Sequence, residues 1–345
     1  MTTRFAITGS GFMGRTHAEA IRRQPMASLV ALAGGTRAEA LATDYGAERA
    51  PSTEALLRRD DIDAVVLTTP HHLHADEAVL ALNQGKHVLV EKPMATSVTD
   101  CDRMIEAAER AGRALRIGYH QRFRVNNATA QQLVRSGGIG EVHAALISMP
   151  TYASTIKDGG FGGNWAWWND PASIGHVLNS APHAIDMMRW LTGAEVRTVS
   201  AMCRTYLPAT PVEDTTMALI EFTNGAICSF FSSRALPAPS FPGEDFRIRI
   251  MGGLGLLDLD PYKELRISDA QGWHTASAQP EVGHEGAHTA FGDVRMQAYT
   301  SQIASFMDAI AGKPATVGTA QDGRAAIAAI AAMLTSSGTR AWVTI

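Results

Sequence analysis

Short apolar runs alternate with segments of helical spacing over the first third of the chain. The predicted strands are Phe5–Thr8, Ser28–Ala33, Asp63–Thr69, Lys86–Val90 and Ala114–Tyr119. The predicted helices run onward from Met13 and then cover Arg37–Tyr45, Ala75–Gln84 and Ser97–Ala111. Strands that alternate with helices of this length imply right-handed βαβ crossovers, so we predict a doubly wound parallel sheet.

The pattern changes in the second half, where short runs rich in β-branched and aromatic residues predict further strands. These runs are Glu141–Met149, Val196–Met202, Thr215–Phe222, Ala226–Ser232 and Phe246–Met251. The dipeptide Asn224-Gly225 lies between two of them and is a strong signal for a β-hairpin. The segment Gly175–Leu191 has the spacing of a helix.

A glycine-rich turn joins the first predicted strand to the first predicted helix. Gly9, Gly11 and Gly14 have the G-x-G-x-x-G spacing of a dinucleotide-binding loop. Phosphates would lie at the positive end of the helix, against the backbone of Phe12 and Met13. The alternative is an ordinary turn, but the position directly after a strand favours the nucleotide site.

The end of the second predicted strand bears on the choice of dinucleotide. A site for NAD usually has an acidic residue there, which accepts hydrogen bonds from the ribose. This strand is instead followed by Gly34, Gly35, Thr36 and Arg37, with no carboxylate before Glu39. Thr36 and Arg37 would suit a 2′-phosphate, so we predict NADP in preference to NAD. The alternative is that Thr36 caps the next helix and Arg37 is solvated.

Composition narrows the class of protein. The chain has 345 residues, of which 46% are hydrophobic and 19% charged, and its net charge is −4. Two domains are expected at this length, and nothing in the charge pattern indicates a nucleic-acid or membrane partner. We find no signal peptide, membrane span or metal-binding motif, and read the three cysteines as reduced. A cytoplasmic protein is therefore expected.

Several motifs together resemble those of the Gfo/Idh/MocA oxidoreductases. Beside the glycine loop they are Thr69-Pro-His-His-Leu-His74, Lys86-His-Val-Leu-Val-Glu-Lys-Pro93 and Gly118-Tyr-His-Gln-Arg-Phe123. The resemblance extends over essentially the whole chain. It implies a Rossmann domain over residues 1–122 and an α+β domain with an open, mainly antiparallel sheet over residues 123–345. In relatives the outer face of that sheet mediates assembly, so a homodimer or homotetramer is implied.

The resemblance also implies the catalytic residues. The lysine of the Glu-Lys-Pro motif, here Lys92, is the acid/base group that handles the alcohol proton. The family pattern Asp-x-Gly-x-His corresponds to Asn179 through His183, with Asn179 in place of the acid and Ala181 in place of the glycine. His183 would assist proton transfer and Asn179 would orient the substrate. The alternative for Lys92 is a surface lysine after a strand.

Other residues in the motifs are candidates for cofactor and substrate contacts. Thr69, His74 and Glu91 are expected at the cofactor, together with Lys92. His120 and Gln121 are candidates for substrate contacts, although they could instead only link the domains. Trp165, on a glycine-rich loop with two further tryptophans, could stack on a ring or merely cover the domain junction.

These features predict an NAD(P)-dependent dehydrogenase or reductase acting on a ring hydroxyl or ketone of a sugar or cyclic polyol. The departure at Asn179 keeps a second substrate class open, an aromatic cis-dihydrodiol or a hydroxy-semialdehyde. A catalytically silent dinucleotide-binding regulator is the alternative from another class. The presence of both Lys92 and His183 argues against such a regulator.

Overall fold

The structure is a computed structural model that describes residues 2–152, 170–208, 210–237, 246–280 and 291–345. The described chain divides into two compact units. Residues 2–123 and 291–324 make up the first unit, and residues 124–152, 170–208, 210–237, 246–280 and 325–345 the second. The chain passes from the first unit to the second after Phe123 and has returned to the first by residue 291. It passes to the second unit again within one long helix, α10 (Ala320–Thr339).

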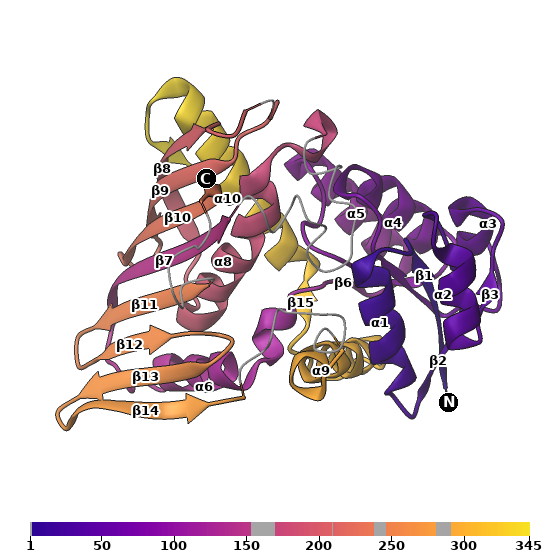
Figure 1. Cartoon of the computed structure of the whole chain (residues 1–345), viewed down its shortest axis with the longest axis horizontal. Coiled ribbons are helices and arrows are strands. Elements are labelled where there is room, and N and C mark those ends of the chain that lie inside the picture. The colour runs from indigo at the N-terminus through magenta and orange to yellow at the C-terminus, as the bar shows by residue number, and fades with distance from the viewer. Residues whose placement is uncertain (1, 153–169, 209, 238–245, 281–290) are drawn as a thin grey trace. The chain divides into compact units, whose positions relative to one another are not determined.

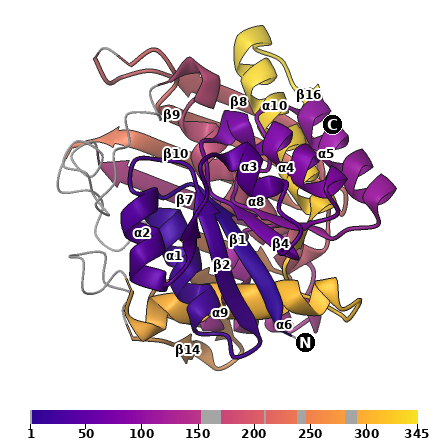
Figure 2. The ribbon, with the colours of Figure 1, turned by 90° about the vertical axis from the view of Figure 1, so that its right-hand side faces the viewer.

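The first unit is built on a seven-stranded sheet of order β15-β6-β5-β4-β1-β2-β3. Figure 2 labels three of these strands, β1, β2 and β4. The strands are β1 (Thr3–Thr8), β2 (Ala27–Ala33), β3 (Glu48–Arg49), β4 (Ala64–Leu67), β5 (His87–Val90), β6 (Leu115–Ile117) and β15 (Gly318–Thr319). All pairs are parallel except β15 with β6. The strand order reverses between β1 and β4, so the prediction of a doubly wound sheet is confirmed.

Helices accompany the crossovers of this sheet. They are α1 (Phe12–Arg22), α2 (Ala38–Tyr45), α3 (Thr53–Leu57), α4 (His74–Asn83), α5 (Val98–Ala111) and the short 3-10 turns η1 (His71–Leu73) and η2 (His120–Phe123). Helices α4 and α5 pack against each other, whereas α1 packs on α9 (Asp293–Ile310). The predicted helices of this region are therefore present within a few residues of their expected limits.

Helix α9 and β15 belong to the first unit, although we expected all residues after 122 in the second domain. The reason is packing: Met296, Ile303 and Phe306 are fully buried in the same core cluster as Phe5 and Ile21. The rings of Phe5 and Phe306 lie 6.2 Å apart. The apolar face of α9 thus covers the sheet beside α1, and the chain must return to the first unit to supply it.

The second unit has a nine-stranded sheet of order β14-β13-β12-β11-β7-β10-β9-β8-β16 (Figure 1). The strands are β7 (Val142–Tyr152), β8 (Val196–Arg204), β9 (Thr215–Phe222), β10 (Ile227–Leu236), β11 (Arg247–Gly252), β12 (Leu256–Leu259), β13 (Glu264–Asp269), β14 (Gly272–Ala278) and β16 (Val343–Thr344). Among the strands that the structure describes in this sheet, the β7–β10 pair alone is parallel, so the expected mainly antiparallel sheet is confirmed. Helices α6 (Val125–Arg135) and α8 (His176–Thr192) contact it, and η5 (Pro171–Ser173) precedes α8.

The predicted hairpin at Asn224-Gly225 joins β9 to β10. Gly225 has φ +84°, and the Phe222 N–H donates to the Ala226 carbonyl oxygen at 2.9 Å. The sequence did not predict β12, β13 and β14. Charged residues interrupt the apolar positions of β12 and β13, and β14 has a single large apolar residue, Trp273. No helix in the described part of the chain is long and apolar enough to cross a membrane.

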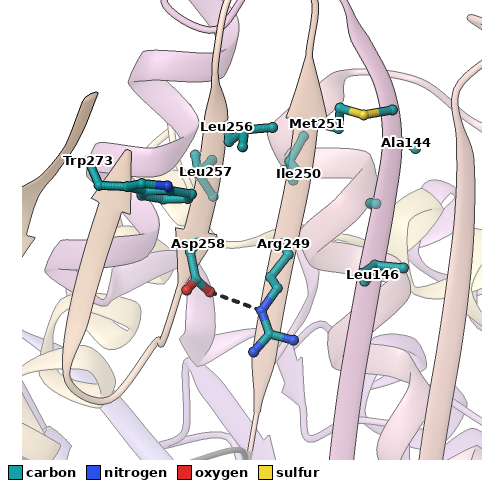
Figure 3. Close-up of a pocket in the computed structure, with 10 residues that line it drawn as sticks. Ala144, Leu146, Arg249, Ile250, Met251, Leu256, Leu257, Asp258 and Trp273 are labelled. Carbon is teal, nitrogen blue, oxygen red and sulfur yellow. Dashed lines mark ion pairs between the residues drawn. The ribbon is translucent and has the colours of Figure 1, made fainter. Parts of the chain in front are cut away.

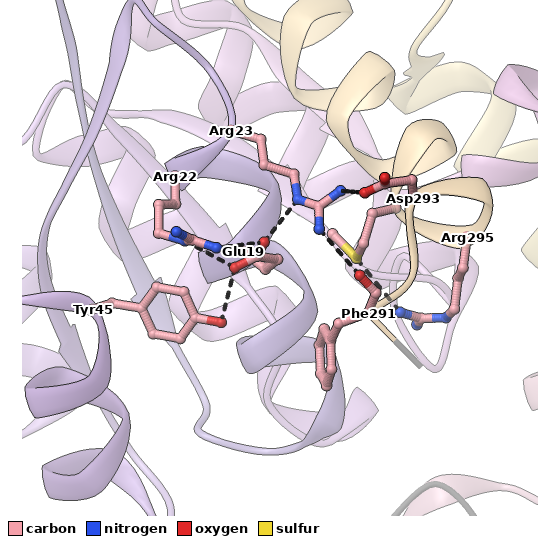
Figure 4. A network of polar contacts seen from close by, with 8 residues as sticks. Glu19, Arg22, Arg23, Tyr45, Phe291, Asp293 and Arg295 are labelled. Atoms are coloured by element: carbon pink, nitrogen blue, oxygen red, sulfur yellow. Dashed lines mark hydrogen bonds and ion pairs between the residues drawn. The ribbon is translucent and has the colours of Figure 1, made fainter. Parts of the chain in front are cut away.

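A polar network ties α1 to α2 and α9 in the first unit (Figure 4). Glu19 on α1 is only 5% exposed and accepts hydrogen bonds from Arg22, Arg23 and the Tyr45 hydroxyl. Arg23 also pairs with Asp293 at 2.9 Å and donates to the backbone at the start of α9. A buried carboxylate costs free energy unless it is paired, so this network is expected to hold the three helices in register.

Replacing Glu19 by Gln should lower the free energy of unfolding by about 1–3 kcal/mol, because charge-assisted hydrogen bonds to two partly exposed arginines are lost. The matched control is Glu39→Gln, which breaks an exposed contact with Arg49 at 3.4 Å and should change stability by less than about 0.5 kcal/mol. Urea denaturation of both variants measures the difference. Equal effects would show that the Glu19 network adds no more than a surface ion pair.

Candidate functional site

The carboxyl ends of β1 and β4 meet at the point where the strand order reverses. Gly9 follows β1 with φ +90°, and a Cβ there would lie 2.7 Å from the Thr68 carbonyl oxygen. A Cβ on Gly14 would lie 2.1 Å from the Gly9 carbonyl oxygen. Real Cβ atoms do not approach so closely, so α1 can pack this near the end of β1 only with glycine at both positions.

The amino terminus of α1 has the form of a phosphate-binding cradle. Gly11 is the N-cap residue, and no side chain in the described part of the chain caps the helix. The first-turn N–H groups, which begin with Phe12 and Met13, therefore point to the place where anions bind at helix ends. The nearest atom to a Cβ built on Gly11 is a guanidinium nitrogen of Arg37, at 3.9 Å.

The turn after β2 contacts this cradle. A Cβ on Gly35 would lie 2.5 Å from the Ser10 hydroxyl oxygen, which also accepts from the Arg37 backbone N–H at 3.2 Å. Thr36 and Arg37 are exposed. The N-cap residue of α2 is Arg37, and it makes no side-chain cap, so capping by Thr36 is not observed. The turn thus places two exposed polar residues beside the glycine loop.

Hydrogen bonds made by two polar side chains of α4, Glu77 and His74, hold the loop after β4 in place. Glu77 on α4 accepts hydrogen bonds from the hydroxyls of Thr8 at 2.8 Å and Thr69 at 2.9 Å. Burial raises the pKa of this carboxyl. The ring of His74 bridges the carbonyl oxygens of Thr69 and Pro93, at 2.8 and 2.9 Å. Burial lowers the pKa of His74, and the two carbonyl acceptors oppose that shift.

Lys92 comes two residues after β5 and is partly buried. Burial lowers the pKa of its ammonium group, while the neighbouring Glu91 acts in the opposite direction. Glu91 itself bonds to the buried His17 ring on α1, with Nε2 and Oε1 2.7 Å apart. Its other oxygen accepts from the Lys92 backbone N–H at 3.2 Å. The loop that carries Lys92 is thereby tied to the nucleotide-binding helix.

His120 and Gln121 follow β6 on η2, and both are buried. The His120 ring stacks on Tyr299 of α9, with centroids 4.5 Å apart and an interplanar angle of 22°. His120 therefore has a packing role within the first unit, whatever else it contacts.

Asn179 and His183 lie on α8 in the second unit, four residues apart and so on one face of the helix. His183 is 7% exposed. Glu213, just before β9, holds the start of α8: its carboxylate accepts from the Val177 N–H, and its carbonyl accepts from the His176 N–H at 3.1 Å. Burial raises the pKa of Glu213 to about 7.

The first unit thus brings together the glycine loop, Thr36, Arg37, Thr69, His74, Glu91 and Lys92, all near the carboxyl ends of its strands. Asn179 and His183 are brought together on a single helix of the second unit. Trp165 lies outside the described residues. The described residues hold no group of three His, Cys, Asp or Glu side chains suited to a metal.

Sequence reasoning missed the roles of His17, Glu77 and Glu213. His17 is buried and the other two are half-buried, and each is bonded to a residue at least 36 positions away. The only signal in the sequence was His17, three residues after the last glycine of the loop.

Comparison with known proteins agrees with this geometry. Residues 3–119 match the Gfo/Idh/MocA "Oxidoreductase family, NAD-binding Rossmann fold", and residues 127–258 match the "GFO/IDH/MocA C-terminal domain". One solved structure that covers all of this chain, and 96% of its own, is GenD2 from gentamicin A biosynthesis in complex with NAD, with TM-score 0.83 and 25% identity.

Two curated relatives resemble the chain over part of their length. A 1-carboxy-3-chloro-3,4-dihydroxycyclohexa-1,5-diene dehydrogenase from Comamonas testosteroni is 36% identical over 179 residues, which is 50% of this chain and 42% of the relative. Inositol 2-dehydrogenase 3 from Saccharopolyspora erythraea is 30% identical over 240 residues, 66% of this chain and 65% of the relative. The chain therefore spans less than two thirds of either relative. The glycine cradle, the Glu91-Lys92-Pro93 loop and the two matching domain models together establish that the chain belongs to the Gfo/Idh/MocA oxidoreductase family.

Proposed function

We propose that the chain is an NAD(P)-dependent oxidoreductase that acts on a ring hydroxyl or ketone of a sugar or cyclic polyol. The observation that carries this proposal is Lys92, whose burial lowers its pKa at the same sheet edge as the glycine cradle. A neutral amine is the form that accepts a proton from an alcohol. A bound nicotinamide would supply or accept the hydride.

In this proposal Lys92 takes the hydroxyl proton as the alcohol becomes a ketone and returns it in the reverse direction. The His17–Glu91 bond keeps the loop of Lys92 in place without itself touching the substrate. His183 would donate or accept a hydrogen bond at the reacting oxygen, and Asn179 would orient a neighbouring hydroxyl. His120, Gln121 and Trp165 remain candidates for the rest of the substrate.

A second substrate class is favoured by two observations. Asn179 brings no charge where the family pattern has an acid, and the Comamonas relative is a dehydrogenase of a carboxylated dihydroxycyclohexadiene. An aromatic cis-dihydrodiol or a hydroxy-semialdehyde is therefore the alternative substrate. A screen of cyclic polyols and dihydrodiols, followed by the absorbance of the reduced cofactor, separates these classes. Dinucleotide binding without any turnover would instead favour a silent regulator.

The proposal also includes NADP as the preferred dinucleotide. Arg37 is exposed beside Gly11, and Glu39, the first acidic residue after β2, contacts Arg49 instead. A guanidinium at this point would pair with a 2′-phosphate.

We further propose that the chain forms a homo-oligomer through the uncovered face of the second sheet. This face exposes large apolar side chains from several neighbouring strands: Leu146, Met202, Met217, Leu219, Ile227, Met251, Leu256 and Trp273. Part of it forms a shallow groove of about 440 Å³, crossed by an Arg249–Asp258 contact of 3.5 Å (Figure 3). A second copy of the same chain presents the same mixture of apolar and charged groups, which supports self-association.

Lys92→Ala should lower kcat/KM at least 100-fold, because general acid–base catalysis contributes roughly 10²–10⁴-fold. Affinity for the dinucleotide should change little. The matched control is Lys313→Ala, an exposed lysine that should leave both quantities unchanged. In the wild type the rate of alcohol oxidation should fall as the pH decreases through the pKa of Lys92, since protonation removes the base. A folded Lys92→Ala variant with near-normal kcat would exclude this role.

Arg37→Ala should weaken NADP binding by about 10–100-fold, given roughly 1.5–3 kcal/mol for a charge-assisted hydrogen bond. NAD lacks the 2′-phosphate and should bind almost as before. Arg49→Ala, another exposed arginine of this unit, is the control and should affect neither dinucleotide. Titration of both dinucleotides into the three proteins measures the effect. Equal losses for NAD and NADP, or tighter wild-type binding of NAD, would contradict the NADP preference.

The double variant Met217→Asp, Leu219→Asp should reduce the mass in solution to that of a single chain, 36.9 kDa. Both side chains are more than half exposed on the uncovered sheet face, where buried carboxylates would oppose contact with a second copy. Light scattering after size exclusion measures the mass. Met26→Asp changes an exposed methionine of the first unit and should leave assembly intact. A wild-type mass of one chain would refute the proposed assembly.

A further inference from the structure

Four side chains from distant parts of the first unit form a stacked column. The guanidinium carbon of Arg295 lies 4.7 Å from the ring centroid of Phe12 and 4.7 Å from that of Tyr299. Tyr299 in turn stacks on His120, with centroids 4.5 Å apart. The order along the column is therefore Phe12, Arg295, Tyr299 and His120.

The two ends of this column are both candidate site residues. Phe12 is the first residue of α1 and directly follows Gly11 in the phosphate cradle. His120 begins η2, after the carboxyl end of β6. Both central residues come from α9, the helix that we expected in the other domain. Residues 295 and 299 thus connect the glycine loop to a strand end on the far side of the reversal point.

Arg295 is fixed by more than its aromatic neighbours. Its side chain is 8% exposed, and one of its Nη atoms donates to the Thr16 hydroxyl at 3.2 Å, one turn after Phe12. A positive charge beside the amino end of a helix is unfavourable, because that end of the helix dipole is also positive. The π faces of Phe12 and Tyr299 offset this repulsion in part, and a bound anion would offset it further.

The column also reaches the lysine loop. His17 meets Tyr299 edge-on, with centroids 6.0 Å apart and an interplanar angle of 88°. The same His17 ring bonds to Glu91, next to Lys92. A displacement of Tyr299 would therefore change its ring contacts with both His120 and His17, and His17 is the partner of Glu91.

Packing alone does not require a cation in this place. Helix α9 is already held in the core by Met296, Ile303 and Phe306. A methionine, although shorter, could also lie between two aromatic rings without placing a charge there. The apolar packing of α9 by itself therefore does not require the charge of Arg295.

We propose that Arg295 is a positioning residue for the dinucleotide: it holds Phe12 and the start of α1 in place and adds positive charge where the phosphates would bind. Tyr299 transmits this arrangement to His120 and, through His17 and Glu91, to the loop of Lys92. This inference rests on the proposed function, since it assumes a dinucleotide at the glycine cradle.

Titration of reduced dinucleotide into the protein, followed by fluorescence and without any substrate, tests the inference. Arg295→Met leaves a shorter apolar side chain without the charge and should weaken binding about 10–30-fold. Arg295→Lys restores the charge without the planar stacking and should recover part of the affinity. The matched control is Arg23→Met, which breaks the other arginine contacts between α1 and α9. It should lower the melting temperature but leave the affinity within about twofold.

The outcomes separate the inference from the proposed function. If the wild type binds the dinucleotide and a folded Arg295→Met variant binds it equally well, the inference is wrong and the function stands. Equal losses in Arg295→Met and Arg23→Met would also overturn it, because the effect would then follow from loosened helix packing. If the wild type binds no dinucleotide, the proposed function fails and the inference fails with it.

Discussion

The first unit depends on the close approach of α1 to the end of β1. A side chain on Gly14 would collide with the Gly9 carbonyl, and one on Gly9 would collide with Thr68 after β4. With glycine at both positions, the amino terminus of α1 comes directly against the carboxyl ends of two neighbouring strands. The first N–H groups of α1 have no partner within the helix. They therefore lie as free donors at the strand ends, where side chains leave room. The turn after β2 then packs on the same loop.

Buried polar bonds hold the surrounding loops to this point. Glu77 accepts from Thr8 and Thr69, so one carboxyl joins the ends of β1 and β4. The His17–Glu91 bond joins α1 to the end of β5. A polar group that loses its partner in the interior costs the fold free energy. The bonds therefore restrict how far the loops can move. Lys92 lies on the loop that the His17–Glu91 bond holds.

The sheet of the second unit has apolar side chains on both faces, but helices cover only one of them in the described part of the chain. Along β9 the buried residues Ala218 and Ile220 alternate with the exposed Met217 and Leu219. Helices cover the first set, and the described part of the chain leaves the second set in contact with solvent. An apolar surface of this extent is costly for a single chain, and this cost is the physical basis of the proposal that a second copy covers the face.

Features that depend on residues close together in the chain could be predicted before the structure was known. The spacing of apolar positions predicted the strands and helices of the parallel sheet, and the glycine spacing predicted the turn after β1. The Asn224-Gly225 pair predicted the hairpin that joins β9 and β10. The resemblance of the Glu91-Lys92-Pro93 segment to a family motif indicated Lys92 as the acid/base group. The roles of Lys92, Asn179 and His183 stay predictions.

Which distant segments meet became known from the packed fold. Helix α9 covers the first sheet although it begins 170 positions after the end of η2, and Arg295 contacts Phe12 across 283 positions. The partner of Glu91 is 74 positions away, and that of Glu213 is 36 positions away. Periodicity along a helix or strand shows which of its faces is buried, because burial of that face requires apolar residues at regular spacing. It does not show which element covers the face, since many apolar surfaces satisfy the same requirement and only the packed fold selects one.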